Sequence, residues 1–192
     1  MAKILGNFHL ALLIGVVLLL AAMFGLHREV MHGAYWAVFA RYLHIFAGVL
    51  WIGLLYYFNF VQIPTMPKVP AELKPGVSKY IAPVALFWFR WAAIATVVIG
   101  LILAELITPG YVGNALKLDP GARTIGIGMW LGLVMAFNVW FVIWPMQKKA
   151  LGIVEVDADT KAKAARTAMI FSRTNVILSL PMLYCMVNFN GG

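Results

Sequence analysis

The stretch Arg41 to Gln62, RYLHIFAGVLWIGLLYYFNFVQ, decides the fold of this chain. It is largely apolar, and about 20 such residues in a helix cross the hydrocarbon core of a bilayer. Comparable stretches fill most of the 192 residues, of which 63% are hydrophobic and only 11% charged. This composition excludes a soluble globular domain, because the apolar surface would exceed any core that the chain could close around.

We therefore predict an all-α integral membrane protein, folded as a single bundle of five transmembrane helices over residues 1–192. We expect the first span to be a retained helix and not a cleaved signal peptide, because its apolar run is long and no small-residue cleavage site follows it. Proline and glycine predict a non-helical loop over residues 63–79 and a turn-rich loop over residues 108–123. The five expected spans cover residues 8–26, 36–61, 80–107, 123–146 and 167–188.

Basic residues are divided unequally between the two ends of the predicted bundle. Lysine and arginine in short loops stay on the cytoplasmic side, so the N-terminus should be cytoplasmic and the C-terminus periplasmic. The net charge of +8 then reflects loops beside anionic lipid head groups, and no nucleic-acid partner is expected. The cytoplasmic set is Lys3, Lys68, Lys74, Lys79, Lys148, Lys149, Lys161, Lys163, Arg166 and Arg173, and the periplasmic set is Arg28, Lys117 and Arg123.

The second span carries a candidate cofactor site. Arg41, His44, Gly48 and Trp51 follow one another at spacings of three or four residues, so they share one helical face. Neutral imidazole is a common axial ligand of haem iron, and an imidazole inside a bilayer is costly unless it is bound. Gly48 would leave room for the flat macrocycle and Arg41 would pair with a propionate. The single Cys185 excludes a C-x-x-C-H attachment, so the prediction is non-covalent haem b.

Two questions about this face remain open at the level of sequence. His44 could instead hydrogen-bond a neighbouring helix while Gly48 permits close helix packing. The second axial ligand is also unassigned, and a five-coordinate haem or no haem are both compatible with the pattern. The candidates for a second ligand are His9, His27, His32, Met129, Met182 and Met186.

A second polar set falls in the cytoplasmic half of the predicted bundle. An arginine at mid-membrane is costly, so Arg90 should face the bundle interior and have a partner. We expect either a hydrogen-bonded network between helices or an anion-binding site, formed by Arg90, Asn138, Arg173 and Asn175, with Asn59 and Ser172 at similar depth. Glu105, near the periplasmic end of the third span, is the expected partner of Arg41 or Arg123.

These residues also bring out a family resemblance. The run from His44 through Trp51 and Gly53 to Pro64 resembles the membrane domain of the bacterial cytochrome-c-linked urate oxidase (urate hydroxylase) family. Residues 138–149, NVWFVIWPMQKK, and the pair SRTN at 172–175 and SLPM at 179–182 resemble it as well. The likeness of the second span extends to other small membrane proteins that hold haem b through a histidine, including the membrane protoporphyrinogen oxidase.

The resemblance implies a membrane redox protein of the bacterial inner membrane. Longer members of that family carry further membrane helices and a C-terminal cytochrome c, which these 192 residues do not contain. Their last helix runs into a histidine where this chain has Val187-Asn188-Phe189-Asn190. The resemblance therefore supports the fold and His44 more than it supports urate chemistry.

The sequence thus predicts haem b on His44, with electrons passed to a separate c-type cytochrome or a larger membrane complex. A urate-like anionic substrate would bind at Arg90, Asn138, Arg173 and Asn175, because two guanidinium groups without a nearby acid favour an anion. The alternative is a non-catalytic accessory subunit of a respiratory or photosynthetic complex, with glycines such as Gly128 and Gly132 serving helix contacts. A transporter is disfavoured, because no repeated half or broken helix pair is visible.

Overall fold

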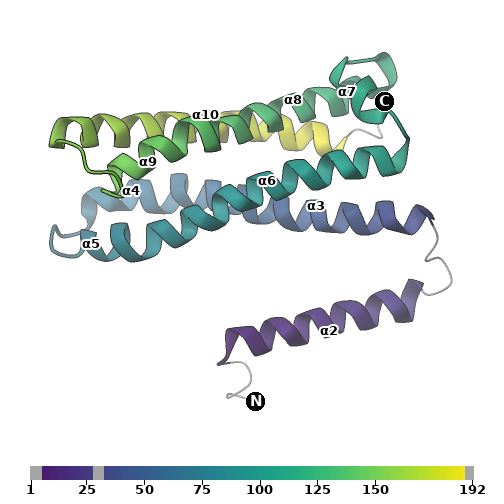
Figure 1. Ribbon diagram of the computed structural model, residues 1–192, viewed down its shortest axis with the longest axis horizontal. Helices are drawn as coiled ribbons and strands as arrows, with labels where there is room; N and C mark the ends of the chain where they lie inside the picture. Colours follow the sequence, from purple (N-terminus) through teal and green to yellow (C-terminus); the bar gives the residue numbers. More distant parts are fainter. Residues whose placement is uncertain (1–5, 28–32, 189–192) are drawn as a thin grey trace. The chain divides into compact units, whose positions relative to one another are not determined.

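The computed structural model describes residues 6–27 and 33–188, and every regular element in these two ranges is helical (Figure 1). Five of the helices are long and apolar enough to cross a membrane, as the sequence predicts. They cover Phe8–His27, Tyr35–Lys68, Lys74–Ile107, Pro120–Ala150 and Ala158–Val187. The chain forms two compact units, Met1–Phe39 and Ala40–Gly192, which are described separately below.

The first unit contains α2 (Phe8–His27) and the first turns of α3 (Gly33–Tyr56). The Asn7 side chain caps the start of α2 by accepting hydrogen bonds from the amides of His9 at 3.0 Å and Leu10 at 3.2 Å. Amides in the first turn of a helix have no partner within the helix, which is why asparagine is favoured there. No residue of α2 is buried, so its leucines and valines present a continuous apolar surface of the kind that lipid covers.

The second unit packs the rest of α3 with α6 (Ala82–Ile107), α8 (Arg123–Phe137) and α10 (Ala158–Val187). Its core holds large side chains that are almost wholly buried, namely Trp51, Leu55, Leu86, Phe89, Met135 and Val139. Helices α8 and α10 run side by side (Figure 1). A Cβ on Gly128 would lie 3.0 Å from Cys185 Cβ, so this glycine permits the close approach predicted for it.

Wide π-helical turns interrupt three of the long helices. They are η2 (Tyr57–Gln62), which leads into α4 (Ile63–Thr65); η4 (Val77–Ile81), which precedes α6; and η6 (Asn138–Ile143), which leads into α9 (Trp144–Ala150). Such turns bond each amide to the carbonyl five residues earlier, and they often occur at functional sites. The amide of Trp144, for example, bonds the carbonyl of Val139. Two of the turns carry asparagines of the predicted polar set.

The prediction of a non-helical loop over residues 63–79 is wrong. The segment contains α4, the 3-10 turn η3 (Met66–Lys68), α5 (Lys74–Gly76) and most of η4. Prolines occupy the first turn of α4, η3 and α5. A missing N–H has no consequence at that position, so these prolines begin helical turns where a breaker was expected.

Two further boundaries differ from the sequence prediction. The loop over residues 108–123 contains α7 (Tyr111–Leu116) and the 3-10 turn η5 (Pro120–Ala122), with Gly110 at φ +81° just before α7. Helix α10 begins at Ala158, ahead of the span expected at residues 167–188, and this confirms the helical lead that residues 158–169, ADTKAKAARTAM, indicate in sequence. Asp157 caps the helix by accepting a 2.9 Å hydrogen bond from the amide of Thr160.

Candidate functional site

The imidazole of His44 connects α3 to α6. Its Nδ1 lies 2.9 Å from the backbone carbonyl oxygen of Thr96. Because a carbonyl oxygen only accepts, Nδ1 is the protonated nitrogen and donates this bond. Nε2 then carries the lone pair, which is the state in which a histidine can ligate a metal. The ring is only half-buried, and no hydrogen bond engages Nε2 within the described residues.

Glycine on α6 makes room for this ring. A Cβ on Gly100 would lie 2.7 Å from His44 Cε1 and 2.9 Å from Nδ1, closer than side chains approach one another. Gly48 faces α6 too, since its Cβ would meet Thr96 Cγ2 at an ordinary 3.7 Å. Gly48 therefore lies in the contact between α3 and α6, which matches the packing alternative. Sequence reasoning predicted neither Thr96 nor Gly100, which lie four residues apart and so share one face of α6.

The other two residues of the predicted cofactor face are placed very differently. Arg41 is exposed, so its guanidinium is available to an anionic partner outside the bundle. Trp51 is 1% exposed and belongs to the hydrophobic core. Its indole Nε1 is buried and lacks a hydrogen-bond partner. Trp51 therefore helps to hold α3, and with it His44, against the core, and its indole does not form an accessible surface beside the imidazole.

A second axial ligand is not evident in the described part of the chain. No group of three or more His, Cys, Asp or Glu residues gathers there. Met182 lies in the core, and the Met186 methyl group packs near Gly128, so both act as packing residues. His9 and His27 belong to the other unit, Met129 is half-buried, and His32 lies outside the described residues. His44 is thus the histidine that the described residues of the second unit offer to a ligand.

In the half of the bundle away from His44, the polar side chains form the predicted hydrogen-bonded network between helices. The Asn138 amide donates to Asn175 Oδ1 at 2.9 Å, and the Asn175 amide donates to the carbonyl of Met135 at 3.0 Å. Asn59 donates to Ser172 Oγ at 2.8 Å and to the carbonyl of Leu55. These bonds join η2 and α10, and η6 and α10, in the buried interior. The network prediction is confirmed for these side chains.

Arg90 faces the bundle interior, as predicted, and is only 8% exposed. Its guanidinium carbon lies 3.4 Å from the centroid of the Trp144 ring, so the cation rests on the indole face. One guanidinium nitrogen, Nη1, is buried without a hydrogen-bond partner. The backbone carbonyl of Arg90 accepts from Trp140 Nε1 at 3.1 Å, which ties α6 to η6. Arg173, the other predicted cation, is exposed and forms no hydrogen bond with a described residue.

Three amide side chains in the same half were missed or undervalued by the sequence analysis. The side-chain carbonyl oxygens of Asn59, Gln62 and Gln147 are buried and accept no hydrogen bond. Gln62 ends η2, and Gln147 lies one turn after Trp144 on α9. Asn59 was already part of the predicted polar set, whereas the sequence signal for Gln62 and Gln147 is only a glutamine near the end of an apolar span. Only the fold reveals that these oxygens are enclosed.

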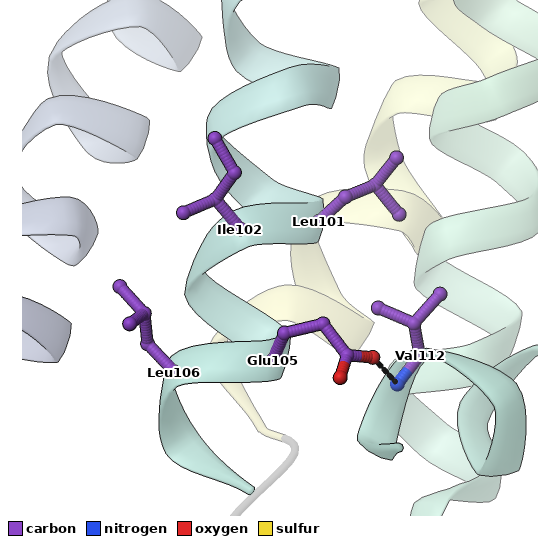
Figure 2. A pocket seen from close by; sticks show the side chains of 5 residues that line it. All are labelled: Leu101, Ile102, Glu105, Leu106 and Val112. Carbon is purple, nitrogen blue, oxygen red and sulfur yellow. Dashed lines mark hydrogen bonds between the residues drawn. The ribbon is translucent and has the colours of Figure 1, made fainter. Parts of the chain in front are cut away.

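At the other end of the bundle, Glu105 closes the turn that follows α6. Its carboxylate accepts from the amides of Gly110 at 2.7 Å and Val112 at 3.1 Å; Figure 2 shows the second of these bonds. The expected pairing with Arg41 or Arg123 is wrong, because the carboxylate caps the start of α7 instead. The hollow beside it, lined by Leu101, Ile102, Glu105, Leu106 and Val112, is shallow and open (Figure 2).

The described residues thus define a class: an all-helical chain with five helices able to span a membrane, whose second unit buries a set of polar side chains that includes one arginine. The model of one protein family, described as the urate oxidase N-terminal region, matches residues 117–190. This segment runs through α8, η6, α9 and α10 and includes Asn138, Gln147 and Asn175; His44 and Arg90 lie outside it. The match supports a relationship to the urate oxidase family over these helices. No curated protein and no solved structure matches the chain.

Proposed function

We propose that the chain is a multi-pass membrane redox protein related to the urate oxidase family, and that it holds haem b through Nε2 of His44. The observation that carries this proposal is the hydrogen bond from His44 Nδ1 to the carbonyl of Thr96. Histidines that ligate metals commonly donate their other N–H to a carbonyl or carboxylate, which fixes the tautomer and the ring. Bound haem b would supply a one-electron carrier within the bilayer.

The surrounding residues would each have a separate task. The carbonyl of Thr96 raises the basicity of the imidazole, and Gly100 leaves space for the ring beside α6. The exposed guanidinium of Arg41, one turn from His44, would pair with a propionate carboxylate. Gly48 and Trp51 would hold α3 against α6 and the core. Electrons would leave to a separate c-type cytochrome or a larger membrane complex.

The proposed location is the bacterial inner membrane, with a cytoplasmic N-terminus and a periplasmic C-terminus. The five apolar helices and the concentration of lysine in alternate loops support this orientation. The cytoplasmic half would then contain Arg90, and the periplasmic half would contain His44. The two candidate sites would face opposite sides of the bilayer.

The proposed substrate is a urate-like anion bound in the cytoplasmic half. A buried guanidinium needs a partner, and no carboxylate pairs with Arg90 among the described residues. The family match over residues 117–190 includes Asn138 and Asn175, which line the same interior. Arg173 is exposed, so within this set it would serve the entrance and not the buried site.

An absorption spectrum of the purified protein, recorded before and after addition of dithionite, tests the haem proposal. We expect reduced b-type bands in the wild type and their loss in His44→Ala. His27→Ala, which removes an imidazole from the exposed helix α2, is the matched control and should keep the bands. A colourless wild-type protein that co-purifies with one membrane complex would overturn the proposal in favour of the accessory-subunit role.

A further inference from the structure

Buried polar atoms without hydrogen-bond partners gather in one half of the bundle. Most buried polar groups in proteins are hydrogen-bonded, and each exception requires an explanation. Among the described side chains, Trp51 Nε1 is one exception, within the hydrophobic core, and the others lie in the cytoplasmic half: Arg90 Nη1, Asn59 Oδ1, Gln62 Oε1 and Gln147 Oε1. Arg90 and Asn59 are 8% and 9% exposed, so water outside the bundle does not satisfy them.

Aromatic contacts join the three elements that carry these four residues. Phe58, next to Asn59, packs edge-on against Phe89, next to Arg90, with ring centroids 5.6 Å apart. The guanidinium of Arg90 in turn lies on Trp144, one turn before Gln147. The residues therefore come from η2, α6 and α9, three elements that meet through aromatic contacts. We call this group the amide–arginine cluster: Asn59, Gln62, Arg90 and Gln147.

The chemistry of the amide–arginine cluster determines both the charge and the hydrogen-bonding groups that a ligand must have. Arg90 offers a positive charge and a free N–H, which requires an acceptor, preferably an anion. The three amide oxygens accept only, so they require donors. An aprotic anion such as chloride would satisfy Arg90 and leave the oxygens unpaired. A flat anion that also carries N–H groups would satisfy all four atoms, and the flat face of the Arg90–Trp144 pair suits a planar ring.

We propose that Asn59, Gln62 and Gln147 are specificity residues, whose side-chain oxygens accept hydrogen bonds from a planar N–H-bearing anion held by Arg90. This proposal takes its anion class from the proposed function and adds the three amides to the site. A group that is built to pair with a donor rejects the analogue without that donor, because the buried acceptor is then left unpaired. N-methylation of the ligand should therefore weaken binding through the amides alone.

Equilibrium dialysis of urate against the purified full-length protein tests the proposal. We expect Gln62→Met and Gln147→Met, which keep the side-chain length and remove the acceptor, each to weaken urate binding about tenfold. Arg90→Gln should abolish binding, whereas Arg166→Gln, which removes an exposed cation of α10 outside the proposed site, should leave it unchanged. Unchanged urate affinity in both methionine variants would overturn the role of the amides.

An N-methylated urate that keeps one acidic N–H separates charge from hydrogen bonding. It should bind the wild type about tenfold more weakly than urate, and at least one of Asn59→Leu, Gln62→Met and Gln147→Met should weaken it no further. A further weakening in all three variants would mean that the amides act only through packing. The methionine variants are expected to unfold at the wild-type temperature or above it, because each removes an unsatisfied buried oxygen.

Two controls distinguish this proposal from the haem proposal and from binding of a lipid. Dithionite spectra of the same samples report on His44, so haem bands without urate binding would contradict only the proposal for the amide–arginine cluster. Urate binding without haem bands would contradict only the redox proposal. Phosphatidylglycerol combines a phosphate with hydroxyl donors. If the wild type retains this lipid, Arg90→Gln does not, and neither binds urate, the ligand of Arg90 is the lipid and not a soluble anion.

Discussion

The imidazole of His44 lies against Gly100 on the neighbouring helix, in space that a Cβ on this glycine would occupy. Gly100→Ala should therefore push the ring away from the carbonyl of Thr96, at a cost of about 1–3 kcal/mol for overpacking. Thermal unfolding and the dithionite spectrum should both change. Gly53→Ala on α3, where a Cβ meets nothing within 4 Å, is the control. Unaltered spectra in Gly100→Ala would show that the Nδ1 bond does not position a ligand.

The Asn138–Asn175 bond should show coupling between two helices. Asn175 is fully buried and bonds both Asn138 and the carbonyl of Met135. Asn138→Leu and Asn175→Leu should each reduce the free energy of unfolding by about 1–3 kcal/mol, since each leaves a buried partner unpaired. The double variant should lose less than the sum of the two. Strict additivity in a double-mutant cycle would argue against a direct bond.

Gly126 should be intolerant of any side chain. A Cβ there would collide with the backbone carbonyl oxygen of Ala115 in α7, and backbone cannot move aside as a flexible side chain can. Gly126→Ala should therefore detach α7 from α8 and speed tryptic cleavage after Lys117. Gly121→Ala, which meets nothing within 4 Å, should be cleaved at the wild-type rate. Equal cleavage of both variants would contradict the close contact.

The cap of α10 should make stability depend on pH. The Thr160 hydroxyl donates to Asp157 Oδ2 at 2.6 Å and its amide to Oδ1, and these bonds hold the pKa of Asp157 below its ordinary value. A carboxylate with a depressed folded-state pKa adds stability above its unfolded pKa, and this is lost as the pH falls through the folded value. Asp157→Ala should thus lower the melting temperature at neutral pH, with a difference that shrinks in acid. An equal difference at neutral and acid pH would argue against the cap.

Thiol labelling tests the proposed orientation. Cys185 is the only cysteine and is buried, so Cys185→Ser gives a background for single introduced cysteines. In intact cells with a permeable outer membrane, Lys117→Cys should react with an impermeant maleimide. Lys163→Cys should react only after the inner membrane is opened. The reverse pattern would invert the topology and exchange the sides assigned to His44 and Arg90.

The sequence predicts the five long helices because their apolar runs are unambiguous in length. The ends at His27, Ile107 and Val187 are predicted to within one residue, whereas those at Lys68 and Ala150 are not. Pro64, Pro67 and Pro75 look like breakers in sequence, yet they occupy first-turn positions, which only the backbone hydrogen bonds reveal. Residues 158–169 do indicate the early helical start of α10, and the structure adds its cap, Asp157, which accepts from the amide of Thr160.

The candidate sites could likewise be predicted only in part from the sequence. The cost of burying a charge in lipid was enough to predict that Arg90 faces inward. The contact of Gly100 with His44 and the unpaired oxygens of Gln62 and Gln147 depend on how the helices are rotated against one another. Helical periodicity assigns residues to faces but does not say which faces meet. Glu105 illustrates this, since a nearby loop amide replaced the arginines that its charge suggested.

The wide turn η6 separates Asn138 from Trp144 and Gln147 along one continuous helix. Winding all of its residues as ordinary α-helix would turn everything downstream by about 100° around the helix axis. Trp144 would then leave Arg90, while Asn138 stayed bonded to α10. The wide turn thus accommodates one extra amino acid and keeps Trp144 on the side of the helix that meets Arg90.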